Sequence, residues 1–117
     1  MIKIFGLLKK KSDITMDEFR QRWYVDHASL ARKVIPYDID SPCRRWVQNY
    51  AVNLGGKKDP PFDAIGETWW DDFEAIKRWA DWYEGDDGKV LRDDEDRFLD
   101  KSRRVILVTD EQIVKPR

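Results

Sequence analysis

His27 is the residue best suited to proton transfer, and it is the single histidine of the chain. Imidazole exchanges a proton near neutral pH more readily than other unperturbed side chains. Phe19, Trp23, His27, Leu30 and Val34 recur at intervals of three and four residues, which is typical of one face of a helix. His27 should therefore point inward, either as a general acid or base or as a buried neutral ring with a structural hydrogen bond.

Glu67 is the second candidate because it interrupts an apolar strand expected over residues 64–70. Burial of a carboxyl group without a partner favours its protonated form and would prepare it for proton transfer. The alternative is a position at the rim of the sheet, where Glu67 would pair with an arginine such as Arg45. The sequence leaves both possibilities open.

Aromatic and sulfur side chains offer weaker candidates. Tyr24, Tyr37 and Tyr50 could donate to a developing oxyanion, although a buried tyrosine more often completes a core with one hydrogen bond. Cys43 follows a proline in a loop with no histidine nearby in the sequence, which disfavours a nucleophilic role. The segment 79–83, with Trp79, could form the wall of a site for a flat ligand or simply a core stripe.

Acidic residues near His27 and late in the chain are expected to face solvent. Asp26 points about 100° away from His27 around a helix, so it should be exposed or paired. The runs at 86–87 and 93–96 lack the spacing of a calcium-binding loop. We interpret them as solvated helix ends and faces.

Composition excludes several classes of partner and cofactor. One cysteine and one histidine rule out an internal disulfide and Cys-rich zinc or iron–sulfur sites, so we do not expect an ordinary transition-metal site. Twenty-two basic and 23 acidic residues give a net charge of -1, which disfavours nucleic acid as a partner. Apolar runs fall short of the roughly 20 residues of a membrane helix, so we expect a soluble, cytoplasmic protein.

The 117 residues should form a single domain over 1–117 with the order β-α-β-β-α-β. A capping box from Thr15 to Glu18 begins the first helix, and Pro36 ends it. The expected strands cover residues 2–8, 44–52, 64–70 and 104–108, and further helices cover 73–83 and, after an interruption at 85–88, part of 89–101. Residues 54–61 should be a flexible connection within a long hairpin. The fold class is therefore α+β, a ferredoxin-like sandwich.

The first strand is apolar on both faces, with Ile2, Ile4 and Leu8 on one side and Phe5 and Leu7 on the other. If both helices cover the same face of the sheet, the other face still carries apolar side chains that need a cover. A second copy of the chain would provide it most simply. We therefore expect a homodimer.

Three segments of the sequence resemble the EthD family of dimeric α+β barrels. They are the opening residues 2–10, the spacing Phe19-x3-Trp23-x3-His27, and Asp63-Ala-Ile-Gly-Glu67-Thr-Trp69-Trp70. The last segment is also similar to small methylmuconolactone methylisomerase-like proteins, although Thr68 stands where some isomerase relatives have cysteine. The resemblance implies a barrel formed by two sheets across a dimer axis, with a pocket between sheet and helices in each subunit.

The resemblance also implies isomerisation, dehydration or decarboxylation of ring compounds without a cofactor. We expect a cofactor-independent isomerase or lyase for a small cyclic, phenolic or carboxylated compound, with His27 and Glu67 as catalytic residues. Trp23, Tyr24, Tyr50 and Trp69 are the expected substrate-binding residues. An alternative is a non-catalytic ligand-binding accessory protein of an oxygenase system, and a third is a haem enzyme with His27 as axial ligand.

Overall fold

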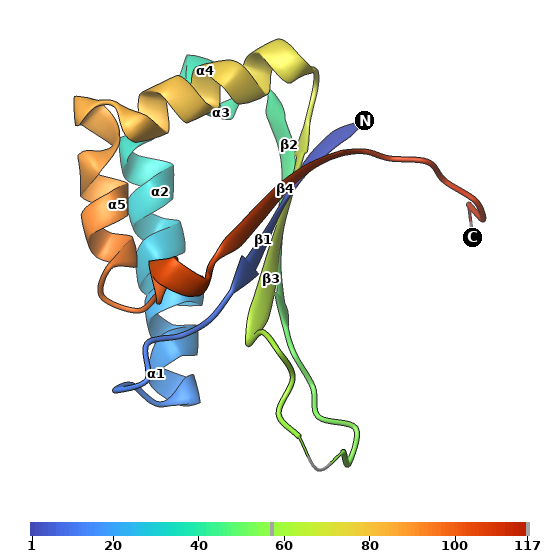
Figure 1. The fold of residues 1–117 in the computed structure, drawn as a ribbon. Helices are drawn as coiled ribbons and strands as arrows, with labels where there is room; N and C mark the ends of the chain where they lie inside the picture. The colour runs from blue at the N-terminus through green and yellow to red at the C-terminus, as the bar shows by residue number, and fades with distance from the viewer. Residues whose placement is uncertain (57, 117) are drawn as a thin grey trace.

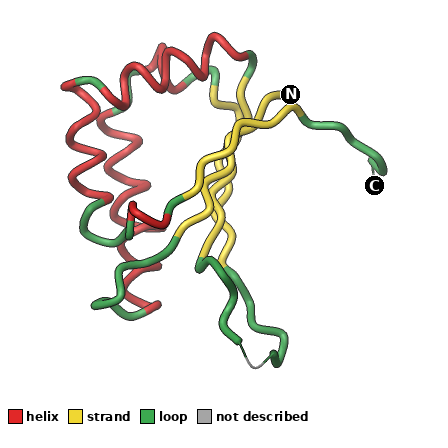
Figure 2. Tube along the Cα trace, in the orientation of Figure 1, coloured by secondary structure: helices red, strands yellow, loops and turns green. Residues whose placement is uncertain are grey.

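The fold is a four-stranded antiparallel sheet with all of its helices on one side, as Figures 1 and 2 show. It is described by a computed structural model that covers residues 1–56 and 58–116. The strands are β1 (Ile2–Leu8), β2 (Cys43–Tyr50), β3 (Ala64–Trp70) and β4 (Val105–Asp110), arranged in the order β2-β3-β1-β4. The expected βαββαβ order is confirmed, and the chain is an α+β protein with a ferredoxin-like fold.

The helices form one layer against the sheet (Figure 1). The first helix of this layer runs without a break through α1 (Met16–Arg20), a π-helical segment (Gln21–His27) and α2 (Ala28–Val34). The short α3 (Tyr37–Asp40) follows it. The second is α4 (Phe73–Glu84), a 3-10 turn (Asp86–Gly88) and α5 (Lys89–Glu95), and a further 3-10 turn (Lys101–Arg103) leads into β4. The helix expected within 89–101 therefore ends earlier than its apolar residues suggest.

The N-terminal end of the first helix follows its sequence signal. The Thr15 hydroxyl accepts a hydrogen bond from the Glu18 backbone N–H at 3.1 Å, while the Glu18 carboxylate turns to Arg22. Only the Thr15 half of the expected capping box is therefore present. The π-helical segment was not predicted by the apolar spacing, because widened turns keep the same side chains inward. Its last residue is His27.

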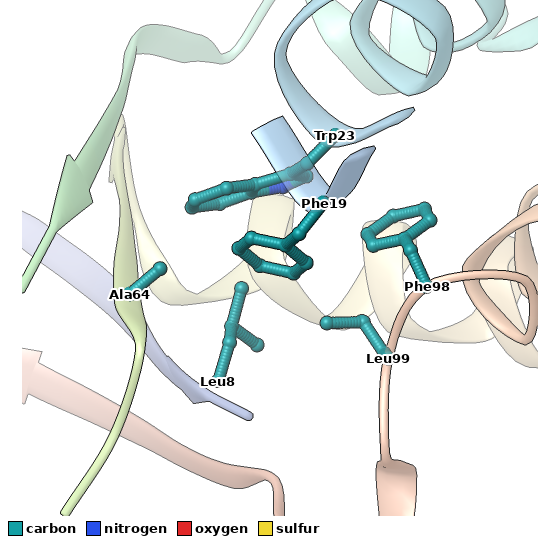
Figure 3. Close-up of a cluster of buried hydrophobic side chains, with 6 residues drawn as sticks. All are labelled: Leu8, Phe19, Trp23, Ala64, Phe98 and Leu99. Carbon is teal, nitrogen blue, oxygen red and sulfur yellow. The ribbon is translucent and has the colours of Figure 1, made fainter. Parts of the chain in front are cut away.

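The core lies between the start of the first helix and the sheet (Figure 3). It contains buried side chains from four parts of the chain: Leu8, Phe19, Trp23, Ala64, Phe98 and Leu99. Gly66 of β3 lies beneath Trp23, and a methyl group there would come within 3.3 Å of the indole Cζ2. The missing side chain thus lets the helix approach the sheet closely enough to fix the position of His27 one helical turn later.

A tight corner joins α4 to α5. Gly88 approaches the end of α4 so closely that an added Cβ would lie 2.5 Å from the Trp82 carbonyl oxygen and closer still to that of Tyr83. The Arg92 guanidinium closes the same corner by donating to the carbonyl oxygens of Gly85, at 2.8 Å, and Tyr83. The corner therefore sets Tyr83 and the residues of α5 at a fixed distance from one another.

The side of the sheet that faces away from the helices is largely uncovered in one chain. The strand registers place alternate residues of all four strands on it, which we call the outer face: Lys3, Phe5, Leu7, Arg45, Val47, Asn49, Ile65, Glu67, Trp69, Val105, Leu107 and Thr109. Phe5 and Leu7 lie on it, as expected from the alternation of the first strand. Leu107 of the edge strand β4 is 49% exposed.

The connection between β2 and β3 joins two antiparallel neighbours, which confirms the expected hairpin. Apart from Lys57, which lies outside the described residues, residues 51–63 form a loop that extends beyond the sheet in Figure 1.

Among the residues that the structure describes, no helix is long and apolar enough to span a membrane.

Candidate functional site

A cavity of about 630 Å³ lies between the sheet and the helix layer. Its walls are mainly apolar, with Ile4 and Trp70 on the sheet side and Ile76, Trp79 and Leu91 on the helix side. Trp70 and Trp79 contact one another with ring centroids 6.0 Å apart. A space of this size and lining suits a small ring compound.

His27 belongs to the wall of this cavity. It is 6% exposed, and its ring packs edge-on against Phe98 with the centroids 5.3 Å apart. The expected inward orientation of His27 is therefore correct. Its position at the end of a π-helical segment is notable because such segments occur frequently at functional sites.

Asp94 of α5 fixes the protonation pattern of the imidazole. Its Oδ2 lies 2.8 Å from His27 Nδ1. An ionised carboxylate can only accept a hydrogen bond, so Nδ1 carries a hydrogen in both the neutral and the charged ring. His27 Nε2 is consequently the nitrogen at which a proton is gained or lost.

Glu95 lies on the other side of the ring. Its Oε2 is 3.8 Å from His27 Nε2, which is too long for a hydrogen bond but close enough for a charge interaction. Its Oε1 accepts from the Tyr83 hydroxyl and from Arg104 Nη1 at 3.4 Å, and it forms an ion pair with Lys101 Nζ at 3.4 Å. A positive charge that develops on the imidazole would thus meet a carboxylate at both nitrogens.

Tyr83 and Arg104, which both contact Glu95, each keep one charge state near neutral pH. Burial raises the pKa of the Tyr83 hydroxyl, and the adjacent Glu95 raises it further, so Tyr83 remains a hydrogen-bond donor. Burial alone would lower the pKa of the Arg104 guanidinium, but Tyr83 and Glu95 more than offset this and raise it. Tyr83, Glu95 and Arg104 all line the cavity together with His27.

Glu67 does not lie beside His27, so the predicted pairing of these two residues in one pocket is wrong. The register pairs Glu67 with Phe5 and Val47, which places it on the outer face, with the sheet between it and the cavity. Its carboxylate accepts from Asn49 Nδ2 at 3.4 Å, whereas Arg45 lies over the ring of Trp69. The ion pair with Arg45 that the alternative interpretation of Glu67 offered is therefore absent among the described residues.

The four expected substrate-binding residues separate into different environments. Trp23 lines the cavity. Tyr24 is 67% exposed, and Trp69 lies on the outer face. Tyr50 packs edge-on against Trp23 at 5.5 Å, inside the core, where burial raises the pKa of its hydroxyl. Of this group, only Trp23 shares the cavity wall with His27 in the described part of the chain.

Asp94 and Glu95 were misinterpreted from the sequence as solvated residues of an acidic run. Glu95 follows Leu91 by four residues and precedes Phe98 by three, and both of these apolar side chains are buried. This helical spacing placed Glu95 on the buried face and was the available signal. The expectation for Asp26 holds, since it is exposed and bonds the Gln21 side chain.

Cys43 lines the cavity as a poorly reactive thiol. Burial raises its pKa to about 11, partly offset by the backbone hydrogen bond to Arg45 and assisted by Asp40. Because the thiolate is the reactive form, we expect iodoacetamide at pH 8 to modify Cys43 much more slowly in the folded protein than in urea. Equal rates, measured by mass spectrometry, would contradict this account of the thiol.

Within the described residues, no group of three or more histidine, cysteine, aspartate or glutamate side chains is placed to hold a metal ion. The polar end of the cavity is instead a network of proton donors and acceptors.

Solved structures with the same fold were found by comparison. An ethyl tert-butyl ether D (EthD) family protein from Bacillus halodurans is 20% identical, with a TM-score of 0.68 and coverage of 96% of this chain and 99% of that chain. An EthD-like protein from Ralstonia eutropha is 13% identical, with a TM-score of 0.69 and coverage of 98% and 95%. A dimeric protein of unknown function and ferredoxin-like fold from Bacteroides fragilis is 12% identical, with a TM-score of 0.59 and coverage of 94% and 95%.

The search of curated proteins gave no match. The model of the EthD domain, in contrast, matches residues 11–102, which include the whole first helix and the polar residues Tyr83, Asp94 and Glu95. The match extends over most of the sequence and agrees with the resemblance of its motifs. The chain therefore belongs to the EthD family.

Proposed function

We propose that this protein is a cofactor-independent isomerase or lyase that acts on a small cyclic, phenolic or carboxylated compound. The observation that carries the proposal is the placement of His27 on the cavity wall with a carboxylate at each ring nitrogen. Such an arrangement stabilises the charge that a base acquires when it takes a proton. An imidazole with only a structural role would need a single hydrogen-bond partner, whereas His27 has a carboxylate near each ring nitrogen.

The proposed reaction begins at His27 Nε2, which takes a proton from the ring compound in the cavity. Asp94 and Glu95 stabilise the imidazolium that results, and Asp94 keeps the ring in its orientation. Return of the proton to a different atom completes an isomerisation, whereas departure of a leaving group completes a lyase reaction. Apolar walls exclude water from the intermediate and strengthen these charge interactions.

Hydrogen exchange provides a test that does not require the natural substrate. The protein is incubated in D2O with a panel of cyclic ketones, lactones and phenolic acids, and loss of C–H signals is followed by proton NMR. The proposal predicts catalysed exchange or conversion of at least one member of the panel. Saturable binding with neither exchange nor conversion would support the alternative, a ligand-binding accessory protein of an oxygenase system.

The outer face supports a second part of the proposal, a homodimer joined through the two sheets. Val47, Leu107 and their neighbours form an apolar surface that crosses all four strands. Related structures from Bacteroides fragilis and Thermobifida fusca are described as dimeric. Packing of two outer faces would complete a barrel and remove the apolar surface from water.

Light scattering at micromolar concentration should give twice the 14.0 kDa mass of one chain. Leu107→Asp should abolish the dimer and leave unfolded or aggregated protein, because a charge cannot be buried there without a partner. Val90→Asp is the matched control, since Val90 is 42% exposed in the helix layer. A folded monomer of the natural sequence would contradict the proposed barrel.

A further inference from the structure

Arg104 lies at the polar end of the cavity, immediately before β4. Its side chain is 22% exposed and sits beside Tyr83 and Glu95. Among the described residues, the hydrogen bonds of this guanidinium all come from Nη1. This nitrogen donates to the Tyr83 hydroxyl at 3.3 Å and to the Glu95 carboxylate at 3.4 Å. The donors on Nε and Nη2 are therefore available to a bound molecule.

The other arginines of the cavity wall are less suited to meet a ligand next to His27. Arg44 is exposed and makes a two-point ion pair with Asp71, at 2.7 and 2.8 Å. Arg45 lies over the ring of Trp69. Arg32 is on an exposed part of α2. Arg104 is the half-buried arginine of the cavity wall whose partner Glu95 also lies beside His27.

The need to hold Glu95 in place does not by itself explain why an arginine stands at position 104. Glu95 Oε1 already accepts from the Tyr83 hydroxyl and lies 3.4 Å from Lys101 Nζ. These two contacts hold the carboxylate without a third donor. A planar guanidinium with unused donors on the cavity wall is instead suited to a negatively charged or polarised oxygen.

We propose that Arg104 binds the oxygen of the substrate on which negative charge develops when His27 removes a proton. This inference rests on the proposed function of His27. It specifies the substrate class as a ring compound in which the carbon that loses the proton is bonded to a carbonyl carbon. The C–H bond breaks, an N–H bond forms at Nε2, the C–H pair becomes a C=C bond, and the carbonyl π pair moves to the oxygen beside Arg104.

A stable phenolate serves as a probe of this oxygen site. 4-Nitrophenol suits the purpose because its ionised form absorbs visible light, so difference spectra show which form the protein binds. The wild-type protein should select the phenolate. Arg104→Gln should weaken phenolate binding about tenfold or more, since a charge-assisted hydrogen bond is lost in a largely apolar site. Arg104→Lys should retain part of the preference.

Three matched variants separate the cation from its surroundings. Arg103→Gln removes a neighbouring exposed arginine and should bind like the wild type. Tyr83→Phe loosens Glu95 but keeps the cation, so it should still select the phenolate. His27→Gln should also retain this selection, which keeps the test separate from the proposed function. Binding of the neutral phenol by the wild type, equal binding by Arg104→Gln, or no binding of either form would overturn the inference.

Discussion

Replacement of His27 with glutamine is expected to lower catalysed hydrogen exchange by about 10²- to 10⁴-fold, the usual contribution of a general base. Glutamine keeps a donor that can serve Asp94 but has no basic nitrogen to take a proton. The loss of the ring contact with Phe98 should cost about 1 to 2 kcal/mol of stability, which leaves the chain folded. Exchange rates from NMR and thermal unfolding followed by circular dichroism measure the two effects.

Asp26→Asn is the control for this substitution. Asp26 precedes His27 in the same helical segment but is exposed, and its carboxylate bonds only the Gln21 side chain among the described residues. The control should retain exchange activity and stability. If the loss of exchange activity in His27→Gln is fully accounted for by the fraction of protein that unfolds, His27 is a structural residue. The proposed role of the cavity as a reaction site is then wrong.

Gly88→Ala is expected to destabilise the protein by about 3 kcal/mol or more, because the added methyl group overlaps the backbone at the end of α4. Its Cβ would lie 2.5 Å from the Trp82 carbonyl oxygen. Relief of this overlap requires α4 and α5 to separate, which also moves Tyr83 away from Glu95. Urea unfolding should show a lower midpoint, and any folded fraction should have lost catalytic exchange.

Gly56→Ala tests whether alanine at a glycine is costly in general. Gly56 lies in the β2–β3 connection, where the nearest atom to an added Cβ is the Asn53 side-chain oxygen at 3.7 Å. Its substitution should change stability by less than about 0.5 kcal/mol, as for most surface positions. A similar small effect for Gly88→Ala would show that the corner between α4 and α5 is not rigid.

Local patterns in the sequence were sufficient to predict most of the fold. Strand propensity predicted β3 over Ala64–Trp70 with its observed bounds, and the spacing from Phe19 to His27 predicted a buried helix face. The π-helical turn could not be predicted, since it changes backbone hydrogen bonds while the apolar side chains stay inward. The early end of α5 was also missed: Leu99 forms an isolated β-bridge with Lys10, a contact that the local apolar spacing does not show.

The site was predicted in part, because His27 was identified but its partners were not. Glu67 and Thr68 point to opposite sides of β3, and both sides of the sheet carry apolar residues. The sequence therefore could not show which side the helices cover. Asp94 and Glu95 lie 67 and 68 residues after His27, so only the packing of α5 against the first helix brings them to the imidazole.

Asp94 holds His27 Nδ1, which leaves Nε2 as the nitrogen that exchanges the proton. Because His27 is the single histidine of the chain, nitrogen-15 NMR of histidine-labelled protein reports on this ring alone. In the neutral ring, the account predicts a protonated Nδ1 and an unprotonated Nε2, and Asp94→Ala should remove this preference. A neutral ring protonated mainly at Nε2 in the natural sequence would contradict the account.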